Sequence, residues 1–327
     1  MKFLVQRYVA LFFCLVPLLG TQTVVAKEWP SQQVKIVLPY PPGGASDTTA
    51  RLLAEKLTKE WGETVVIENR PGANGIIANE LVAAAAPDGY TILMANLGPN
   101  AINHAVYSKL RYDSIKDFDP VVLATLVPQV ILVKSDSKLN TLKDLVDLAK
   151  AQPDEVTFGS AGIGASNHLS GEMLNSMAGI KMRHVPYKGD APSITDTIGG
   201  QIMVVLPTVV AGIPHIKGGK LKPLAVTSKQ RISSLPDVPT VNEALGLNSY
   251  EAVSWGGFMV PDGTPSAITA KINAGIDKAL RMPDIKQKFT ELGAEIVSGS
   301  PEEFRVFLLN ENAKWKKVAD DANIRIQ

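Results

Sequence analysis

Three segments of the chain combine glycine, proline and small polar residues in a way that could bind an anion. They span residues 40–47 (YPPGGASD), 159–168 (GSAGIGASNH) and 187–193 (YKGDAPS). Each segment lies between an expected strand and a run with helical spacing, so each is expected to lead into the first turn of a helix. Unpaired N–H groups and the positive end of the helix dipole meet at such a turn and attract a carboxylate or another anion.

Each segment on its own also fits a simple connection, because glycine and proline are common in turns. Three of them, divided between two parts of the chain, favour a convergent carboxylate site. Lys188 and Arg51 are candidate counter-charges, although an ion pair with Glu55 four residues later is favoured for Arg51. His168 stands in the first turn of an expected helix, where a ligand contact is plausible, whereas His184 is interpreted as an ordinary structural histidine.

The sequence lacks the motifs of common catalytic classes. Phe158 stands where a nucleophile elbow around Ser160 needs its first glycine, and there is no P-loop pattern. The stretch GIGASN from Gly162 lacks the third glycine of a dinucleotide fingerprint. The four histidines (His104, His168, His184 and His215) show no zinc-binding spacing, and there is a single cysteine. The sequence therefore predicts no catalytic residue, cofactor or metal, and favours a binding protein over an enzyme.

The first 26 residues differ in kind from the rest of the chain. Lys2 and Arg7 are followed by an apolar run that is shorter than the roughly 20 residues of a membrane-spanning helix, and small residues close the segment. This order is typical of a secretory signal, and we expect cleavage after Ala26. A retained membrane anchor is the alternative. Lipidation of Cys14 is disfavoured because the bulky Phe13 precedes it.

Removal of that segment changes the composition that matters for function. The whole chain has 327 residues, with 33 Lys and Arg against 32 Asp and Glu, and 45% hydrophobic residues. Without residues 1–26 it has 301 residues, 31 basic against 32 acidic residues and no cysteine. The apolar fraction excludes a disordered chain, and the balanced charge predicts no nucleic-acid partner. Any preference for anions must therefore be local.

The remaining sequence alternates short apolar runs with amphipathic runs, a pattern that predicts parallel sheets with crossover helices. The expected strands lie within 29–38, 64–68, 90–95, 121–133, 156–158, 182–185, 202–206 and 223–227. The expected helices lie at 47–61, 76–86, 142–151, 166–177, 193–198, 209–217, 266–281, 285–292 and 301–320, with Thr141 as a helix cap.

This order predicts an α/β protein of two lobes, each a mixed but mostly parallel sheet flanked by helices. The block after residue 255 has three helices and few strands, so we expect it to pack on the first lobe. Lobe 1 then comprises residues 27–128 and 254–327, and lobe 2 comprises residues 129–253, with the chain crossing twice between them. Ligands of such sheets bind beyond the carboxyl ends of the strands, which here is the cleft between the lobes.

Nine strings, in this order, give the chain a family resemblance from about residue 29 to the last helix. They are PYPPGGASD, VIENRPGANG, PDGYTIL, YDSIKDFDPV, FGSAGIGASNHLSGE, HVPYKGDAP, HIKGGKLKPLAVTSKQR, SLPDVPTVNEA and SWGGFMVPDGTP. The series resembles the tripartite tricarboxylate transporter substrate-binding proteins, the Bug family of bacterial periplasmic receptors.

The resemblance implies a type II-like periplasmic binding protein whose two lobes close on a dicarboxylate, a tricarboxylate or an aromatic acid. It also implies a periplasmic location, integral-membrane transporter subunits as partners, a monomer, and a ligand held mainly by backbone groups and ordered water. Family members place the matching loops in the cleft. The site residues implied are Tyr40, Pro42, Gly43, Gly44, Ala45, Ser46, Asp47, Asn96, Gly98, Ser160, Ala161, Gly162, Asn167, His168, Tyr187, Lys188 and Gly189.

One departure from the family pattern concerns the ligand. Family members show an aspartate after Gly-Gly-Gln-(Ile/Val) and an aromatic residue three positions later, where this chain has Met203 and Leu206. In the family this strand end faces the cleft, so Met203 and Pro207 join the expected site, and the less polar wall favours an acid with an apolar or aromatic body. The alternative is that Met203 packs in the core of its lobe.

Two rival functions stay open on the sequence. A ligand-presenting partner of a membrane receptor kinase would share every feature named above. A secreted α/β enzyme that acts on a carboxylate would need an activated nucleophile or a metal, and the sequence offers neither.

Overall fold

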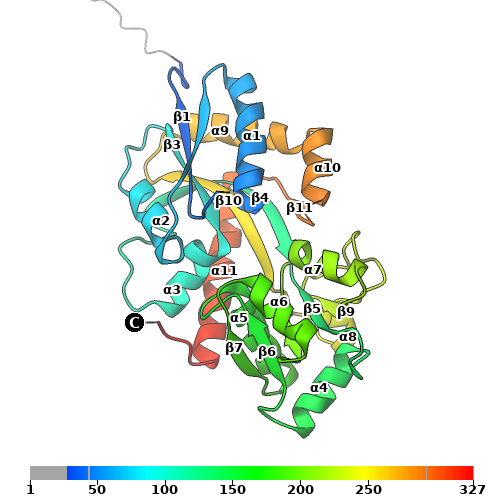
Figure 1. Cartoon of the computed structure of the whole chain (residues 1–327). Helices are drawn as coiled ribbons and strands as arrows, with labels where there is room; N and C mark the ends of the chain where they lie inside the picture. Colours follow the sequence, from blue (N-terminus) through cyan, green and yellow to red (C-terminus); the bar gives the residue numbers. More distant parts are fainter. Residues whose placement is uncertain (1–27, 43–44, 292, 327) are drawn as a thin grey trace, which may run out of the picture.

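The computed structural model describes residues 28–326 except Gly43, Gly44 and Leu292. The expected signal segment and its cleavage after Ala26 lie outside the described residues. Over the part of the chain that is described, no helix is both long and apolar enough to cross a membrane. Figure 1 shows two lobes, one above the other, with strands running between them.

The upper lobe of Figure 1 is built on a six-stranded sheet in the order β11-β4-β10-β3-β1-β2. Its strands are β1 (Val34–Leu38), β2 (Val65–Asn69), β3 (Thr91–Asn96), β4 (Phe118–Pro128), β10 (Val253–Pro261) and β11 (Glu295–Ile296). β1 pairs in parallel with β2 and β3, whereas β10 is antiparallel to β3 and β4. Because β1 and β3 are parallel neighbours, the loops that follow them emerge at the same edge of the sheet.

The lower lobe has a five-stranded sheet in the order β7-β6-β8-β5-β9. Its strands are β5 (Val130–Lys134), β6 (Thr157–Ser160), β7 (Arg183–Pro186), β8 (Val204–Val205) and β9 (Leu221–Val226). β6 pairs in parallel with β7 and β8, and β5 is antiparallel to β8 and β9. The loops after β6, β7 and β8 therefore share one edge, as the loops after β1 and β3 do in the upper lobe.

Helices flank both sheets in the places that the sequence predicts. They are α1 (Ala45–Trp61), α2 (Ile76–Ala83), α4 (Leu142–Ala151), α5 (Ser166–Ala178), α6 (Asp190–Gly199), α7 (Val209–Lys217), α9 (Ser266–Leu280), α10 (Pro283–Glu291) and α11 (Pro301–Asp321). The expected cap at Thr141 is present as a capping box with Asp144. The short turns η1 (Ala73–Gly75), η2 (Gly98–Ile102), α3 (Asn103–Val106) and α8 (Val241–Leu245) were not predicted.

The extended stretch expected over 121–133 is present, and two strands of different sheets share it. β4 ends at Pro128 and β5 begins at Val130, and the intervening Gln129 is held by Thr227, whose Oγ1 accepts from its N–H at 2.8 Å. The apolar run is continuous there, so hydrophobicity alone does not mark the crossing. The crossing itself lies where the sequence placed it, and the exact lobe boundaries stay predictions.

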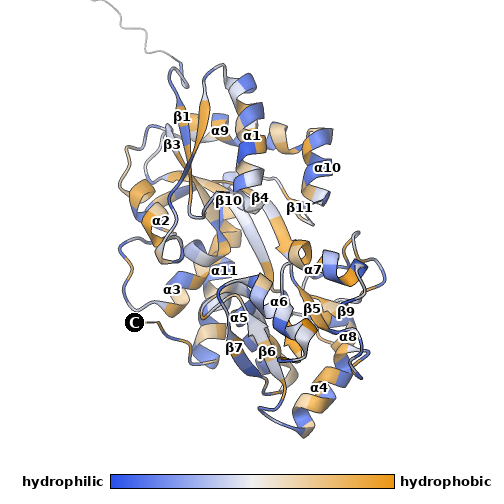
Figure 2. Cartoon of the chain, in the orientation of Figure 1, coloured by the Kyte–Doolittle hydropathy of each residue, from blue (hydrophilic) through white to orange (hydrophobic). Residues whose placement is uncertain are grey.

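The last part of the chain, from about residue 255, packs on the upper lobe, as expected, and it also contributes a strand to the middle of the sheet. β10 lies between β4 and β3 in the middle of the sheet. Trp255 on β10 and Trp315 on α11 are both buried, and both donate their Nε1–H to Glu311 Oε2, at 3.0 and 2.8 Å. α11 also contacts α5 of the lower lobe. Figure 2 shows β4 and β5 as strongly hydrophobic, as expected for strands covered on both faces.

Candidate functional site

In the upper lobe, the loop after β1 is tied to the end of β2 through Asp47. The Asp47 carboxylate is buried, and it accepts from Asn69 Nδ2 at 2.9 Å and Arg51 Nε at 3.0 Å. Asn69 Nδ2 also donates to the Tyr40 carbonyl oxygen at 3.0 Å. The favoured pair of Arg51 with Glu55 is wrong, because Arg51 binds Asp47 four residues earlier. Gly43 and Gly44 lie outside the described residues.

The loop after β3 meets the loop after β1, as their parallel pairing requires. Ser46 Oγ donates to Asn96 Oδ1 at 3.3 Å, and a Cβ at Gly98 would lie 3.5 Å from the Tyr40 hydroxyl. Burial raises the pKa of Tyr40 to about 12, so its hydroxyl keeps its proton at neutral pH and can donate. Five residues expected from sequence, Tyr40, Ser46, Asp47, Asn96 and Gly98, are thus neighbours in one lobe.

In the lower lobe, the N–H groups of the loop after β6 already have partners inside the protein. The N–H of Ala161 donates to Asn167 Oδ1 at 3.0 Å, that of Gly162 to Ser160 Oγ at 3.1 Å, and that of Gly164 to His168 Nδ1 at 3.2 Å. The side chains expected to touch a ligand are thus turned back onto their own loop. Free donors for an anion must come from the first turns of the helices that follow.

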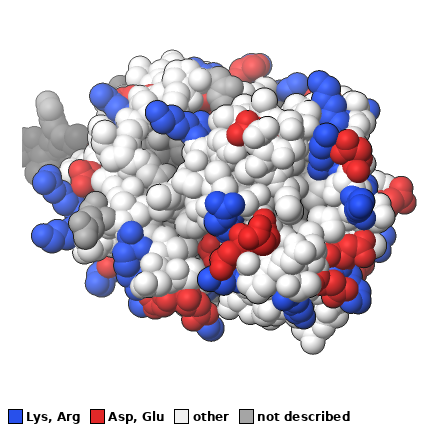
Figure 3. Space-filling model, turned by 60° about the horizontal axis from the view of Figure 1, so that its bottom comes forward, with Lys and Arg blue, Asp and Glu red and all other residues white. Residues whose placement is uncertain are grey.

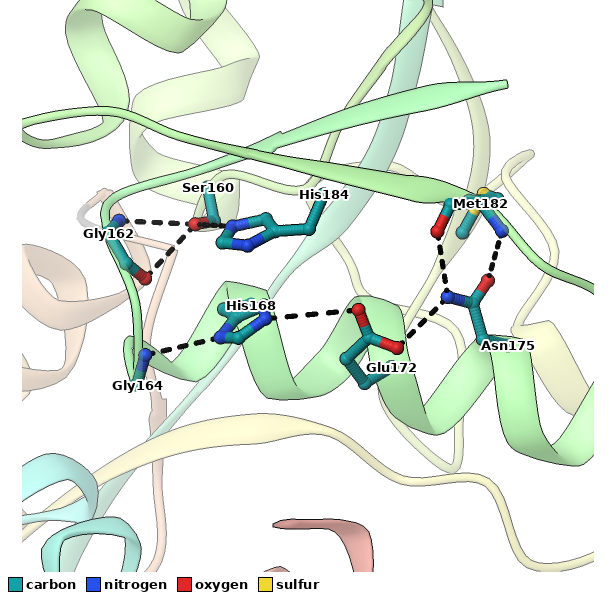
Figure 4. A network of polar contacts seen from close by, with 8 residues as sticks. All are labelled: Ser160, Gly162, Gly164, His168, Glu172, Asn175, Met182 and His184. Atoms are coloured by element: carbon teal, nitrogen blue, oxygen red, sulfur yellow. Dashed lines mark hydrogen bonds and ion pairs between the residues drawn. The ribbon is translucent and has the colours of Figure 1, made fainter. Parts of the chain in front are cut away.

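Figure 4 shows a histidine pair beneath this loop that sequence reasoning missed. His184 Nε2 lies 2.5 Å from Ser160 Oγ, and the His184 ring stacks on His168 with centroids 3.7 Å apart. His168 Nε2 faces Glu172 Oε1 at 3.8 Å. Phe158 packs against both rings. The parallel register, in which Phe158 pairs with His184, is the signal that could have placed His184 next to Ser160.

Both histidines are neutral at neutral pH. Burial, together with the neighbouring His184, lowers the pKa of His168 to about 3, and burial lowers the pKa of His184 to about 4. Burial also raises the pKa of Glu172. Since His168 Nδ1 accepts a hydrogen bond, its proton is on Nε2 and faces Glu172.

The loop after β7 joins this arrangement through its backbone. The N–H of Tyr187 donates to the Ser160 carbonyl at 3.0 Å, and that of Gly189 to the Ala161 carbonyl at 3.2 Å. Gly189 has φ 111°, a conformation that favours glycine. Lys188 is exposed and forms no ion pair with a described residue.

Met203 lies away from these loops. Its N–H donates to Thr157 Oγ1 at 3.1 Å, which sets it at the amino end of β8, level with the start of β6. Its side chain is 43% exposed, so it does not pack in the lobe core either. Pro207 follows the carboxyl end of β8, and its carbonyl accepts from the N–H of Val130 at 3.0 Å. Leu206 is fully buried.

A cavity of about 780 Å³ is lined by residues of both lobes, and none of the site residues expected from sequence lines it. Leu126 and Val253 of the crossing strands form part of its wall, along with Arg281 and Lys286. Arg281 is held by Asp277 at 2.7 Å. Figure 3 views one face of the whole molecule, on which basic and acidic side chains are interspersed, in line with the balanced net charge of the chain. Among the described residues, no group of three or more His, Cys, Asp or Glu could hold a metal.

Known proteins resemble the chain over nearly its whole length. The family model for the tripartite tricarboxylate transporter family receptor matches residues 49–324. Protein BugT of Bordetella pertussis is 32% identical over 305 residues, which are 93% of this chain and 93% of BugT.

Two solved structures share the fold. The R. palustris Rpa4515 structure with adipate is 36% identical, with a TM-score of 0.79, and the match covers 91% of this chain and 100% of that one. MatC (Rpa3494) from Rhodopseudomonas palustris with bound malate is 32% identical, with a TM-score of 0.75 over 89% and 99% of the two chains. The two-lobed fold and the family resemblance are therefore confirmed, and this chain belongs to the tripartite tricarboxylate transporter receptor family.

Proposed function

We propose that this protein captures a small organic carboxylate between its lobes in the periplasm and delivers it to integral-membrane transporter subunits. The observation that carries the proposal is the meeting of loops at the carboxyl ends of parallel strands. Loops after β1 and β3 lie together in one lobe, and loops after β6, β7 and β8 in the other. The adipate and malate held by the similar structures support a carboxylate as the ligand.

Within that cleft we assign ligand contact to residues of the upper lobe and a supporting role to residues of the loop after β6. The hydroxyls of Tyr40 and Ser46 and the amide of Asn96 would bind the ligand directly, together with the first-turn N–H groups of α1, α5 and α6. Ser160 is fully buried and His168 is 5% exposed, so these two would hold their loop in shape. Met203 is left out of the proposed site because it lies at the wrong end of β8.

The Ser160–His184 pair does not favour the enzyme alternative, although its spacing is that of a nucleophile and its base. Ser160 has no exposed surface, and a histidine whose burial lowers its pKa to about 4 is a weak base. The Gly162 N–H, which could stabilise an oxyanion, already donates to Ser160 itself. We therefore propose capture without turnover, by a monomer whose lobes close around the acid.

A thermal-shift screen of ligand-stripped protein, lacking residues 1–26, tests this proposal. Mono-, di-, tri- and aromatic carboxylic acids are added in turn. A ligand at a hundredfold excess over its Kd should add about 2.7 kcal/mol to the free energy of unfolding. Mass spectrometry after overnight incubation should return the same acid unchanged. A panel without any shift would reject carboxylate capture, and a new product would reject a purely binding role.

A further inference from the structure

Asp190, the first residue of α6, connects the starts of three helices of the lower lobe. Its Oδ1 accepts from Asn167 Nδ2 of α5 at 2.8 Å, and its carboxylate also accepts from the backbone N–H of Thr208, the N-cap of α7. Asn167 in turn accepts the N–H of Ala161 through its Oδ1. One carboxylate of the protein thus sits where the loops after β6, β7 and β8 meet.

This carboxylate uses donors that a ligand carboxylate would otherwise use. The side-chain amide of Asn167 and the N–H of Thr208 are both directed at Asp190. The loop N–H groups of Ala161, Gly162 and Gly164 are satisfied internally as well. The lower lobe therefore presents few free hydrogen-bond donors besides the first turns of its helices.

The Asp190 charge also stays without a cation among the described residues. No Lys, Arg or His nitrogen that the structure describes lies within ion-pair distance of it. Lys188 is two residues away, but its side chain is exposed, where water and salt screen its charge. Asp190 is half-buried, so its negative charge acts on a neighbouring group more strongly than a fully solvated one would.

The upper lobe is different in charge. Among the described residues of the proposed site in this lobe, Asp47 is the acidic side chain, and Arg51 neutralises that carboxylate at 3.0 Å. The neutral Tyr40 hydroxyl belongs to the same loops, together with Ser46, which donates to Asn96 Oδ1, and Asn96, whose Nδ2 donates to the Met94 carbonyl at 3.0 Å. A ligand carboxylate is thus favoured against the upper lobe and opposed by like charge against the lower lobe.

We propose that Asp190 is a specificity-determining residue, which directs the uncharged end of the ligand to the lower lobe. The receptor then prefers acids with a carboxylate at one end only over acids with a carboxylate at both ends. This inference rests on the proposed function and narrows its ligand class. It also separates this chain from the similar structures, which hold the dicarboxylates adipate and malate.

The test uses acids of equal length that differ only in the second carboxylate. Ligand-stripped protein is titrated by calorimetry at pH 7.5 with hexanoate and adipate, and then with benzoate and terephthalate. The wild type should bind each monoacid at least about tenfold more tightly than its diacid. Asp190→Asn, which keeps the shape of the side chain, should tighten diacid binding about tenfold or more and leave the monoacid Kd within about threefold. A tenfold change corresponds to about 1.4 kcal/mol.

One control variant and one replacement variant accompany the test. Asp147→Asn removes an exposed carboxylate on α4 that pairs with Lys143. It should leave the Kd ratio of diacid to monoacid unchanged for both pairs of acids. If Asp190→Asn unfolds, Asp190→Ser replaces it, and the wild-type ratio stands as a test in its own right.

The outcomes separate the inference from the proposed function. Equal or tighter binding of the diacids by the wild type, or a ratio that Asp190→Asn does not change, would overturn the role of Asp190 while carboxylate capture stands. Binding of none of the four acids by any form would overturn the role of Asp190, and a blank wider carboxylate panel would remove the proposed function as well.

Discussion

The two lobes build their binding loops by the same rule but leave them in different states. In each lobe, parallel neighbouring strands bring loops to one edge of a sheet. In the upper lobe, hydroxyl and amide groups of Tyr40, Ser46 and Asn96 stand near one another beside a neutralised Asp47. In the lower lobe, the loop N–H groups are satisfied by Ser160, Asn167 and His168.

This difference teaches that a glycine-rich loop after a strand is not by itself an anion site. In the proposed function, hydroxyl and amide groups of the upper loops bind the ligand, whereas the loop after β6 is held in shape by Ser160, Asn167 and His168. Substitutions in the lower lobe should therefore act mainly on stability, and substitutions in the upper lobe mainly on affinity.

The largest expected effect comes from acid, through the histidine pair of the lower lobe. Burial lowers the pKa of His168 to about 3 and of His184 to about 4, from an ordinary value of 6.5. Below pH 6.5 the two histidines are protonated in the unfolded chain but not in the folded one. The stability of the fold is therefore unaffected by them above that pH, and it is lost progressively as the pH falls towards 4. We expect the free energy of unfolding to drop by up to about 4 kcal/mol between pH 7 and pH 5.

Other buried groups bear on this loss and set the control. Burial raises the pKa of Glu172 and Asp190, which act in the opposite direction, and lowers the pKa of His104 in the upper lobe, which acts in the same one. Urea unfolding at pH 7, 6 and 5 measures the sum. In His184→Gln, unfolding should take up about one proton fewer, so the free energy of unfolding should depend less steeply on pH. An unchanged pH profile would show that the two histidines are not held in the neutral form by burial.

A second contrast compares two glycines, one in each lobe. A Cβ on Gly171 in α5 would lie 2.3 Å from the buried Phe158 ring, which the two histidines hold in place. A Cβ on Gly98 would meet the Tyr40 hydroxyl at 3.5 Å, an ordinary contact. We expect Gly171→Ala to destabilise the fold by about 2 kcal/mol and Gly98→Ala by less than about 0.5 kcal/mol. Thermal unfolding of both variants measures this, and equal losses would refute the contrast in packing.

The smallest effect, and the sharpest, separates stability from affinity with two serines. Ser160→Ala would leave the Gly162 N–H and the His184 ring without a buried partner, at a cost of about 1–2 kcal/mol in stability. Ser46→Ala should cost less than about 0.5 kcal/mol in stability, yet weaken acid binding about fivefold. Unfolding curves give the free energy of unfolding of both variants, and binding isotherms give their Kd for the acid. A reversed pattern would exchange the roles of the two lobes.

The sequence predicted most of the fold because its alternating runs are long and well separated. It placed the crossing between the lobes within the apolar run of β4 and β5, but it did not predict the central place of β10, whose partners lie far away along the chain. Periodicity reports which face of an element is apolar, but not which sheet the element joins.

The loops of the candidate site were predictable, whereas the use of their polar groups was not. Glycine content marked the loops after β1, β6 and β7, but only the fold shows that Asn167 and His168 turn back to accept loop N–H groups. Met203 was misplaced because a two-residue strand leaves its ends undetermined by pattern. Asp190 lies in one of the three segments expected to bind an anion but was not among the expected site residues, because its partners on α5 and α7 are distant in sequence.

Calorimetric titration of the ligand-stripped protein with carboxylic acids tests the central claim most directly, with Asn96→Ala as the matched variant. Capture in the interlobe cleft predicts one acid per chain, a Kd that Asn96→Ala raises about tenfold or more, and recovery of the acid unchanged. No heat with any carboxylate, or an equal Kd in Asn96→Ala, would contradict a cleft built on the loops of the upper lobe.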